Sequence, residues 1–243
     1  MTTPSMWAMG EVTLDGHTVS GLTLTLQPGF TVSGRLQFSG TMAPPDPTRL
    51  RITLSPVTNP GQVNLGTSPA IVNADGTFTI TGVTPGSYRM TAMIPGARPD
   101  LPGWVLASAV AEGRDMLDLP LQIGQNISDV MLTFTDSPAE LSGALQDPAG
   151  RPAPDYSIIV FASDRTFWTP QSRRIRAMRP SADGRFIMRS LPPGDYLISA
   201  VADIEDGEWF DPNVLQQLGR VSMPITIADG EKKTQNIQVG AGR

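Results

Sequence analysis

The stretch that decides the fold reads Asp75-Gly76-Thr77-Phe78-Thr79-Ile80-Thr81-Gly82-Val83-Thr84-Pro85-Gly86-Ser87-Tyr88-Arg89-Met90. Asp-Gly is a tight-turn dipeptide, because glycine accepts the positive φ that most residues avoid. A run of alternating apolar residues follows, then a Pro-Gly turn, then a second alternating run. The stretch therefore predicts a β-strand, a tight turn and a second β-strand.

A relative of this stretch occurs 108 positions later, as Asp183-Gly184-Arg185-Phe186-Ile187-Met188-Arg189-Ser190-Leu191-Pro192-Pro193-Gly194-Asp195-Tyr196-Leu197-Ile198. In both copies the apolar residues of the first strand are expected to point into a core. The phenols of Tyr88 and Tyr196 are expected to bond to nearby backbone and hold the corner, much as a tyrosine corner does. The stretch thus indicates architecture rather than activity.

The flanking segments repeat as well. The opening strand at 30–38 matches 139–145, the next strand at 49–54 matches 157–161, and a closing hairpin occurs at 16–26, 119–134 and 224–239. In the first of these hairpins, Leu22, Leu24 and Leu26 match Val130, Leu132 and Phe134, so residues 19–26 are expected to form a strand with one buried face. The loops that contain Trp104 and Trp209 precede the two later hairpins.

This period is too long for a solenoid and suits tandem β-sandwich domains. We therefore expect an all-β fold: two tandem Greek-key, prealbumin-like sandwiches of about seven strands each. Residues 1–28 are expected to be the terminal hairpin of a preceding repeat, 29–136 the first domain and 137–243 the second. A single short helix is expected at 211–218, with Asp211 as its cap and Pro212 at its first position.

Composition supports this fold and excludes several functions. Of 243 residues, 24 are Gly and 23 are Pro, which is high for a helical protein, and only 17% are charged. A net charge of -5 argues against nucleic-acid binding, which normally needs a basic face. The chain has no Cys, and no apolar run is long enough to span a membrane.

The second unit carries a resemblance to a known family. Ser142-Gly143, Asp183-Gly184-Arg185-Phe186 and Leu191-Pro192-Pro193-Gly194-Asp195-Tyr196 resemble the carboxypeptidase regulatory-like domain, a transthyretin-like sandwich also similar to Cna-B repeats and starch-binding modules. The first unit departs at Gly82-Val83-Thr84-Pro85-Gly86, where Thr84 stands in place of the first Pro. The resemblance implies tandem, non-catalytic modules of secreted or periplasmic bacterial proteins. It says almost nothing about a ligand.

The search for catalytic and metal-binding groups yields little. His17 is the single histidine and follows a turn, so no Ser-His-Asp triad or histidine metal site is expected. Five carboxylates in residues 203–211 could wrap Ca²⁺, but their spacing does not fit an EF-hand, and a solvated loop in which Asp211 caps a helix is preferred. We expect no catalytic residue, no metal and no cofactor.

Loop aromatics are the remaining candidates for recognition. The possible ligand or partner contacts are Trp104, Phe167, Trp168, Trp209 and Phe210. Aromatic faces on a β-sandwich can grip sugar rings, and Trp is favoured at protein interfaces. The alternative is local packing, in which the indoles cover the ends of the sandwich and nearby arginines pair with the acidic loop.

These observations predict a non-enzymatic, monomeric module that acts as a structural, spacer or protein-interaction domain at the bacterial cell envelope. The alternative is a carbohydrate-binding module that uses the loop aromatics as sugar platforms. Protein or polysaccharide partners fit either function. A periplasmic or extracellular location is expected, and the lack of a signal peptide at Met1 is expected to reflect N-terminal truncation.

Overall fold

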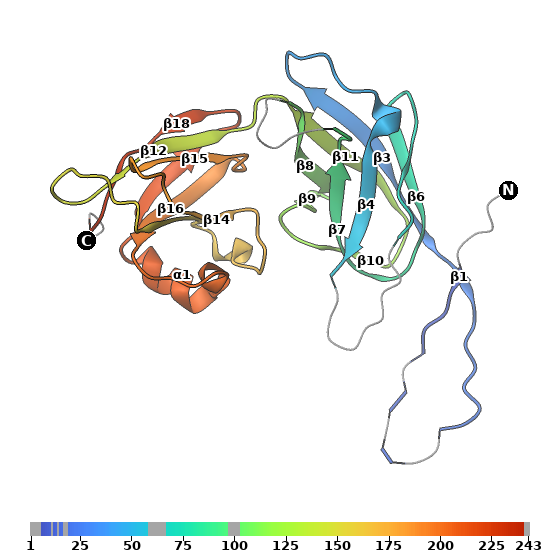
Figure 1. Ribbon diagram of the computed structural model, residues 1–243. Helices are drawn as coiled ribbons and strands as arrows, with labels where there is room; N and C mark the ends of the chain where they lie inside the picture. The colour runs from blue at the N-terminus through green and yellow to red at the C-terminus, as the bar shows by residue number, and fades with distance from the viewer. Residues whose placement is uncertain are drawn as a thin grey trace. The chain divides into compact units, whose positions relative to one another are not determined.

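A computed structural model describes residues 6–10, 12–13, 15–16, 19–57, 67–96 and 103–240. The chain divides into two compact units, Met1–Phe134 and Thr135–Arg243. Each unit is built mainly of β-sheets packed around a core, which confirms the predicted all-β class (Figure 1). Within the described residues, no helix is long and apolar enough to cross a membrane.

The sandwich of the first unit has two sheets in the part of the chain that the structure describes. One has the order β10 (Leu121–Ile123), β7 (Gly86–Met93), β4 (Arg51–Pro56). The other has the order β5 (Ile71–Val72), β6 (Thr77–Val83), β3 (Phe30–Ser39), β11 (Ile127–Thr135), β8 (Val105–Ala111), β9 (Arg114–Asp115). A 3-10 helix, η1 (Pro47–Arg49), precedes β4.

The second unit repeats this plan. One sheet has the order β15 (Arg185–Arg189), β12 (Glu140–Gln146), β18 (Lys232–Thr234), and β19 (Ile237–Gln238) also pairs with β12. The other has the order β14 (Ile175–Met178), β13 (Ser157–Ala162), β16 (Gly194–Val201), β17 (Met223–Ile227). The helical elements are η2 (Arg165–Phe167), η3 (Glu208–Phe210) and α1 (Pro212–Gly219).

The sequence repeat is therefore a repeat of strand order. In each unit the opening strand, β3 or β12, lies between the Asp-Gly strand and the closing strand. In each unit the tyrosine strand, β7 or β16, lies between its neighbours β4 and β10 or β13 and β17. The deciding stretch supplies one strand to each sheet of its sandwich and the turn that joins them.

Local geometry explains why that stretch folds as predicted. Gly76 and Gly184 have φ values of 79° and 80°, which a residue with a side chain avoids. Phe78 and Phe186 are buried in the two cores. The hydroxyl of Tyr88 donates to the Thr84 carbonyl at 2.9 Å, and that of Tyr196 donates to the Pro192 carbonyl at 2.7 Å. The predicted tyrosine corner is confirmed in both units.

The glycine of the Ser-Gly pair in the opening strand is required for a different reason, the close approach of another strand. A Cβ on Gly34 would lie 1.9 Å from the Val130 carbonyl oxygen, and one on Gly143 would lie 2.0 Å from the Gln235 carbonyl oxygen. Atoms cannot approach so closely, so only glycine fits where the closing strand passes the opening strand.

Three predictions were wrong. The two segments of each closing hairpin do not pair with each other but lie in different sheets: β10 pairs with β7 while β11 lies beside β3, and β17 pairs with β16 while β18 pairs with β12. Residues 105–111, expected as part of a loop, form β8 beside β11. The run at 19–26 is not a strand: β1 (Met6–Trp7) pairs with β2 (Gln27–Pro28), and Leu22, Leu24 and Leu26 are all more than half exposed. No sheet covers this run within the described residues, whereas the matching residues of β11 lie in a complete sandwich.

Helical elements form an additional layer in the second unit. All six residues of β13 are buried, because η2, η3 and α1 cover the face of its sheet that points away from the core. Ile159 and Phe161 lie on that covered face, and the matching residues of β4 are Arg51 and Thr53. The helix α1 begins where predicted, and Asp211 accepts a hydrogen bond from the Asn213 amide at 2.7 Å.

Candidate functional site

Three of the five candidate aromatics gather on this additional layer. Trp168 is buried, and Trp209 and Phe210 pack half-buried on the same apolar cluster, whose centre is formed by Phe161 and Leu215. We call residues 163–174 and 203–222 the helical cap.

Trp168 serves the cap as a packing residue. Its indole Nε1 donates to the Ala162 carbonyl at 2.8 Å, and its ring meets Phe161 edge to face with centroids 5.8 Å apart. The Arg165 guanidinium lies over the ring, 5.2 Å from the centroid. Only 9% of the residue is exposed, so a sugar could stack on this indole only after the loop had moved.

Phe167 is half-buried beside Trp168. The guanidinium of Arg174 lies 4.6 Å from the centre of its ring and also donates to the Pro193 carbonyl at 3.0 Å. The cation-π contact connects the cap to the turn that the tyrosine corner holds. The pairing of nearby arginines with the acidic loop stays a prediction.

Trp104 lies in the other unit. Its indole Nε1 donates to the Ala43 carbonyl at 3.1 Å, and its ring meets Phe38 edge to face at 5.3 Å. Phe38 in turn stacks on Phe134 of β11. Trp104 is only 8% exposed, so it covers the core and holds the loop that contains Ala43.

The aromatic set is therefore split. Trp168, Trp209 and Phe210 come together on one cluster, Phe167 precedes Trp168 in sequence, and Trp104 belongs to a different core. The side chains that keep ring surface accessible are Phe167, Trp209 and Phe210. A role for the five residues in contacting a ligand remains a prediction.

The acidic loop is organised by its own backbone. A carboxylate oxygen of Glu208 accepts from the Glu205 amide at 3.0 Å, and Asp211 caps α1. Gly207 adopts a φ of 90° at the start of η3. Across the described part of the chain, no group of three His, Cys, Asp or Glu side chains is placed to hold a metal ion.

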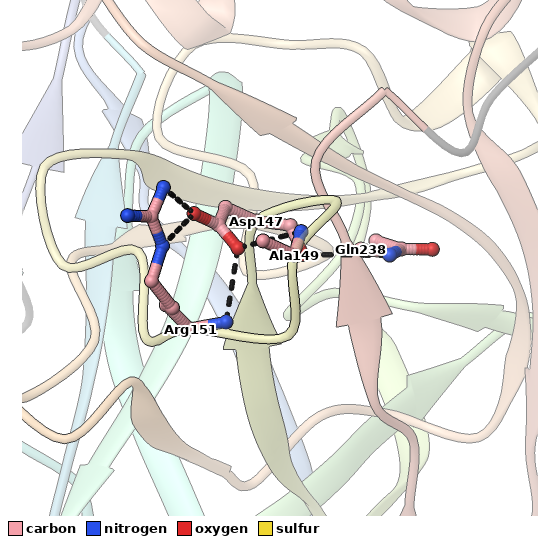
Figure 2. Close-up of polar contacts among 4 residues, drawn as sticks. All are labelled: Asp147, Ala149, Arg151 and Gln238. Atoms are coloured by element: carbon pink, nitrogen blue, oxygen red, sulfur yellow. Dashed lines mark hydrogen bonds and ion pairs between the residues drawn. The ribbon is translucent and has the colours of Figure 1, made fainter.

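Aspartates at the turns form the most regular polar feature. Asp147 is the best connected: it accepts from the amides of Ala149 and Arg151 at 2.8 and 2.9 Å, and from the Arg151 guanidinium at 2.7 Å (Figure 2). The side-chain amide of Gln238 donates a hydrogen bond to the backbone carbonyl of Asp147 at 3.4 Å, which connects the turn to the closing strand. The hydrogen bond from the Arg151 amide is the main cause that lowers the pKa of Asp147.

The same arrangement recurs at other turns. A hydrogen bond from the Thr77 hydroxyl lowers the pKa of Asp75, and one from the Ser181 hydroxyl lowers the pKa of Asp183. Hydrogen bonds to the ionised form stabilise it. These carboxylates act as acceptors that fix turns, and a lowered pKa suits that role better than that of a general base near neutral pH.

One hollow of about 220 Å³ lies in the second unit, between β16, the start of β17 and residues 236–240. Ser199, Asn236 and Gln238 are among its polar walls. The Asn236 side-chain oxygen already accepts from the Ala144 amide at 3.0 Å. Pockets for small molecules usually enclose about 300–1,000 Å³. Sequence reasoning missed this hollow, because its walls come from segments far apart in the chain and share no motif.

Comparisons with known proteins show likeness at the level of structure only. No family profile matches the chain, and no curated protein matches it in sequence. Among solved structures, the minor pilin GBS52 of Streptococcus agalactiae is 13% identical, with a TM-score of 0.34 over 86% of this chain and 94% of that one. The major pilin subunit BcpA of Bacillus cereus is 10% identical, with a TM-score of 0.33 over 96% of this chain and 77% of that one.

The TIE protein of Bacillus anthracis is 12% identical, with a TM-score of 0.29 over 89% of this chain. The chain spans 36% of the length of that protein. The chain is thus distantly similar in structure to pilin subunits. At these identities and TM-scores, the likeness carries no argument about function.

Proposed function

We propose that this chain is a non-catalytic tandem module of the carboxypeptidase regulatory-like kind, and that it acts as a structural, spacer or protein-interaction domain at the bacterial cell envelope. The single observation that carries the proposal is the pairing of the first and last strands of the second unit. In that unit β12 runs parallel to β18 and β19.

Parallel terminal strands have a mechanical consequence. The chain enters the unit at the start of β12 and leaves it after β19, so tension along the chain pulls the two strands in opposite directions past each other. Backbone hydrogen bonds then carry the load together, in shear. They include the Glu140 amide to the Glu231 carbonyl, the Gln235 amide to the Ser142 carbonyl and the Val239 amide to the Gln146 carbonyl, each at 2.8 Å. This geometry suits a domain that spaces or holds.

The polar and aromatic side chains described above support the same function. The turn aspartates are occupied by backbone amides and hydroxyls, and two of the four tryptophans, Trp104 and Trp168, are buried in cores. These groups stabilise the fold, so they are poorly placed for catalysis.

Force spectroscopy tests the proposal. The chain has no cysteine, so pairs of introduced thiols define the pulling direction without ambiguity. A chain with Ser137→Cys and Gln238→Cys loads β12 against β19 in shear, and one with Ser137→Cys and Asp229→Cys opens the strands from one end. We expect the shear pair to unfold at a force several times higher. Equal forces in the two geometries would contradict a load-bearing function.

A carbohydrate-binding module is the second candidate, and the accessible ring surface of Phe167, Trp209 and Phe210 is the observation that favours it. Affinity electrophoresis against a panel of polysaccharides tests this function. Retardation of the chain that Trp209→Ala abolishes, with the unfolding midpoint unchanged, would support it. Migration unchanged by every polysaccharide would exclude those sugars as ligands.

A further inference from the structure

We propose that residues 19–26 of the N-terminal hairpin (residues 6–28) form the closing strand of a third sandwich, and that its partner is a module of this repeat that lacks a closing strand. The observation is a stripe of apolar side chains. Val19, Leu22, Leu24 and Leu26 are 45%, 55%, 54% and 64% exposed. Single exposed apolar residues are ordinary, but a continuous row of them marks an interaction surface.

The internal repeat shows what covers such a stripe. Adding 108 to each position gives Ile127, Val130, Leu132 and Phe134, which are 3%, 0%, 0% and 0% exposed. The spacing is identical, and every counterpart lies in the core of the first unit. A stripe with this spacing is therefore buried by a sandwich of this repeat when the sandwich is complete.

The two arms of the N-terminal hairpin are held together at their base. The arms run side by side: β1 and β2 pair, and a Cβ on Gly10 would lie 2.9 Å from the Leu24 side chain (Figure 1). The Trp7 indole donates to the Pro28 carbonyl at 3.2 Å and its ring packs near Phe30. The hairpin thus has a fixed base, while the face with the stripe has no cover among the described residues.

The complete units define the partner. A closing strand lies beside an opening strand that carries glycine, and the carbonyl of Val130 or Gln235 approaches that glycine. By the same register, the Leu22 carbonyl would face the glycine of the partner's opening strand. The two units of this chain already hold β11 or β18 and β19 at that place. The partner is therefore a further module with the place beside its opening strand free.

Thiol labelling in a fusion protein tests the inference. Residues 29–118, the first sandwich without its closing hairpin, are fused to the N-terminus of the intact chain. The matched fusion carries residues 29–134, which keep their own closing hairpin. Leu24→Cys is the reporter on the stripe. Ser20→Cys is the control, since its counterpart Ser128 stays exposed in a complete unit.

We expect Leu24→Cys to react fast in the intact chain and in the 29–134 fusion, and about a hundredfold more slowly in the 29–118 fusion, because the thiol then reacts only when the module opens. Ser20→Cys is expected to react at one rate in all three. Equal labelling of Leu24→Cys in the two fusions would overturn the proposal. Protection of that thiol in the intact chain at high concentration only would also overturn it, because a second copy would then be the partner.

This inference does not depend on the proposed function. A chain that spaces and a chain that binds sugar would both complete a third sandwich in the same way. The labelling rates are unaffected by the unfolding force, so either proposal can fail alone.

Discussion

The phenol of Tyr196 stabilises the corner of the second unit through a short buried hydrogen bond, and it also accepts a longer one of 3.4 Å from the Arg174 guanidinium. It donates to the Pro192 carbonyl, and the side chain is almost fully closed to water. Tyr196→Phe keeps the ring and removes the donor, which leaves that carbonyl buried without this partner. We expect a loss of about 1–2 kcal/mol in the free energy of unfolding. Urea denaturation of the two proteins measures it.

Tyr156→Phe is the matched control, because Tyr156 is only half-buried and no hydrogen bond of its phenol is seen among the described residues. The control should unfold at the urea concentration of the parent chain. If Tyr196→Phe also unfolded at that concentration, the phenol hydroxyl would contribute nothing to stability and the corner would be held by packing alone.

The turn aspartates predict how stability depends on pH. Hydrogen bonding to the Ser181 hydroxyl lowers the pKa of Asp183 in the folded chain below its ordinary value. The unfolded state therefore binds the proton more readily, and stability falls as the pH falls. The contribution is complete above the ordinary pKa of about 3.9 and is lost as the pH falls through the folded value.

Asp183→Asn tests this dependence, because an amide at this position does not titrate. The urea midpoint of the parent chain should fall as the pH is lowered from about 5 to 3, through the ordinary aspartate pKa. The variant should show a shallower fall, since the other turn aspartates still titrate. Parallel curves would mean that Asp183 has the same pKa in both states.

At the scale of elements, the helix α1 covers the outer face of β13. Leu215 is its only fully buried residue and packs on the cluster that contains Ile159 and Phe161. Leu215→Ala leaves a cavity in that layer, and we expect the second unit to lose about 2–5 kcal/mol in free energy of unfolding. Gln216→Ala changes an exposed residue of the same helix and should be nearly neutral. Thermal unfolding of both variants measures the difference.

If Leu215→Ala and Gln216→Ala both unfolded at the temperature of the parent chain, α1 would contribute little to the stability of the second unit. The accessible ring surface of Trp209 and Phe210 would then no longer be a fixed feature of the fold.

The elements show what alternation can and cannot predict. It predicted the strands on either side of the Asp-Gly and Pro-Gly turns, because one face of each is buried and the other is not. The sequence also contains a signal for the helical cap: Ile158-Ile159-Val160-Phe161 is continuously apolar, which is typical of a strand buried on both faces. The matching strand β4 alternates instead, and its outer face is polar.

Alternation failed at residues 19–26 for a physical reason. The pattern shows that a segment could bury one face, but burial requires a sheet to pack against. Leu22, Leu24 and Leu26 follow the alternating pattern, but no sheet of the described residues packs against them, so they are exposed. The sequence could not place the loop aromatics for another reason. The sequence around a loop Trp is the same whether the ring covers a core or faces water, and only the fold shows that Trp104 and Trp168 cover cores.

At the scale of the whole molecule, the closing strand of each unit packs against a single glycine of the opening strand. Gly34 and Gly143 hold the same place in their units, and in each the closing strand passes where a Cβ would be. Each sandwich has its own core cluster, so closure is a property of the unit and not of the chain. A methyl group at one glycine should therefore open one unit only.

We predict that Gly143→Ala destabilises the second unit by about 3 kcal/mol or more, because the Gln235 carbonyl must move and the hydrogen bonds of the closing strand move with it. Gly34→Ala should do the same to the first unit. Hydrogen exchange resolved by peptide measures both: amides of β12 to β17 lose protection in one variant, and amides of β3 to β7 lose it in the other. Gly124→Ala, at a turn with open space around it, should change neither. Loss of protection in both units after either substitution would show that the two sandwiches unfold as one body, and the repeat would then be a single cooperative domain.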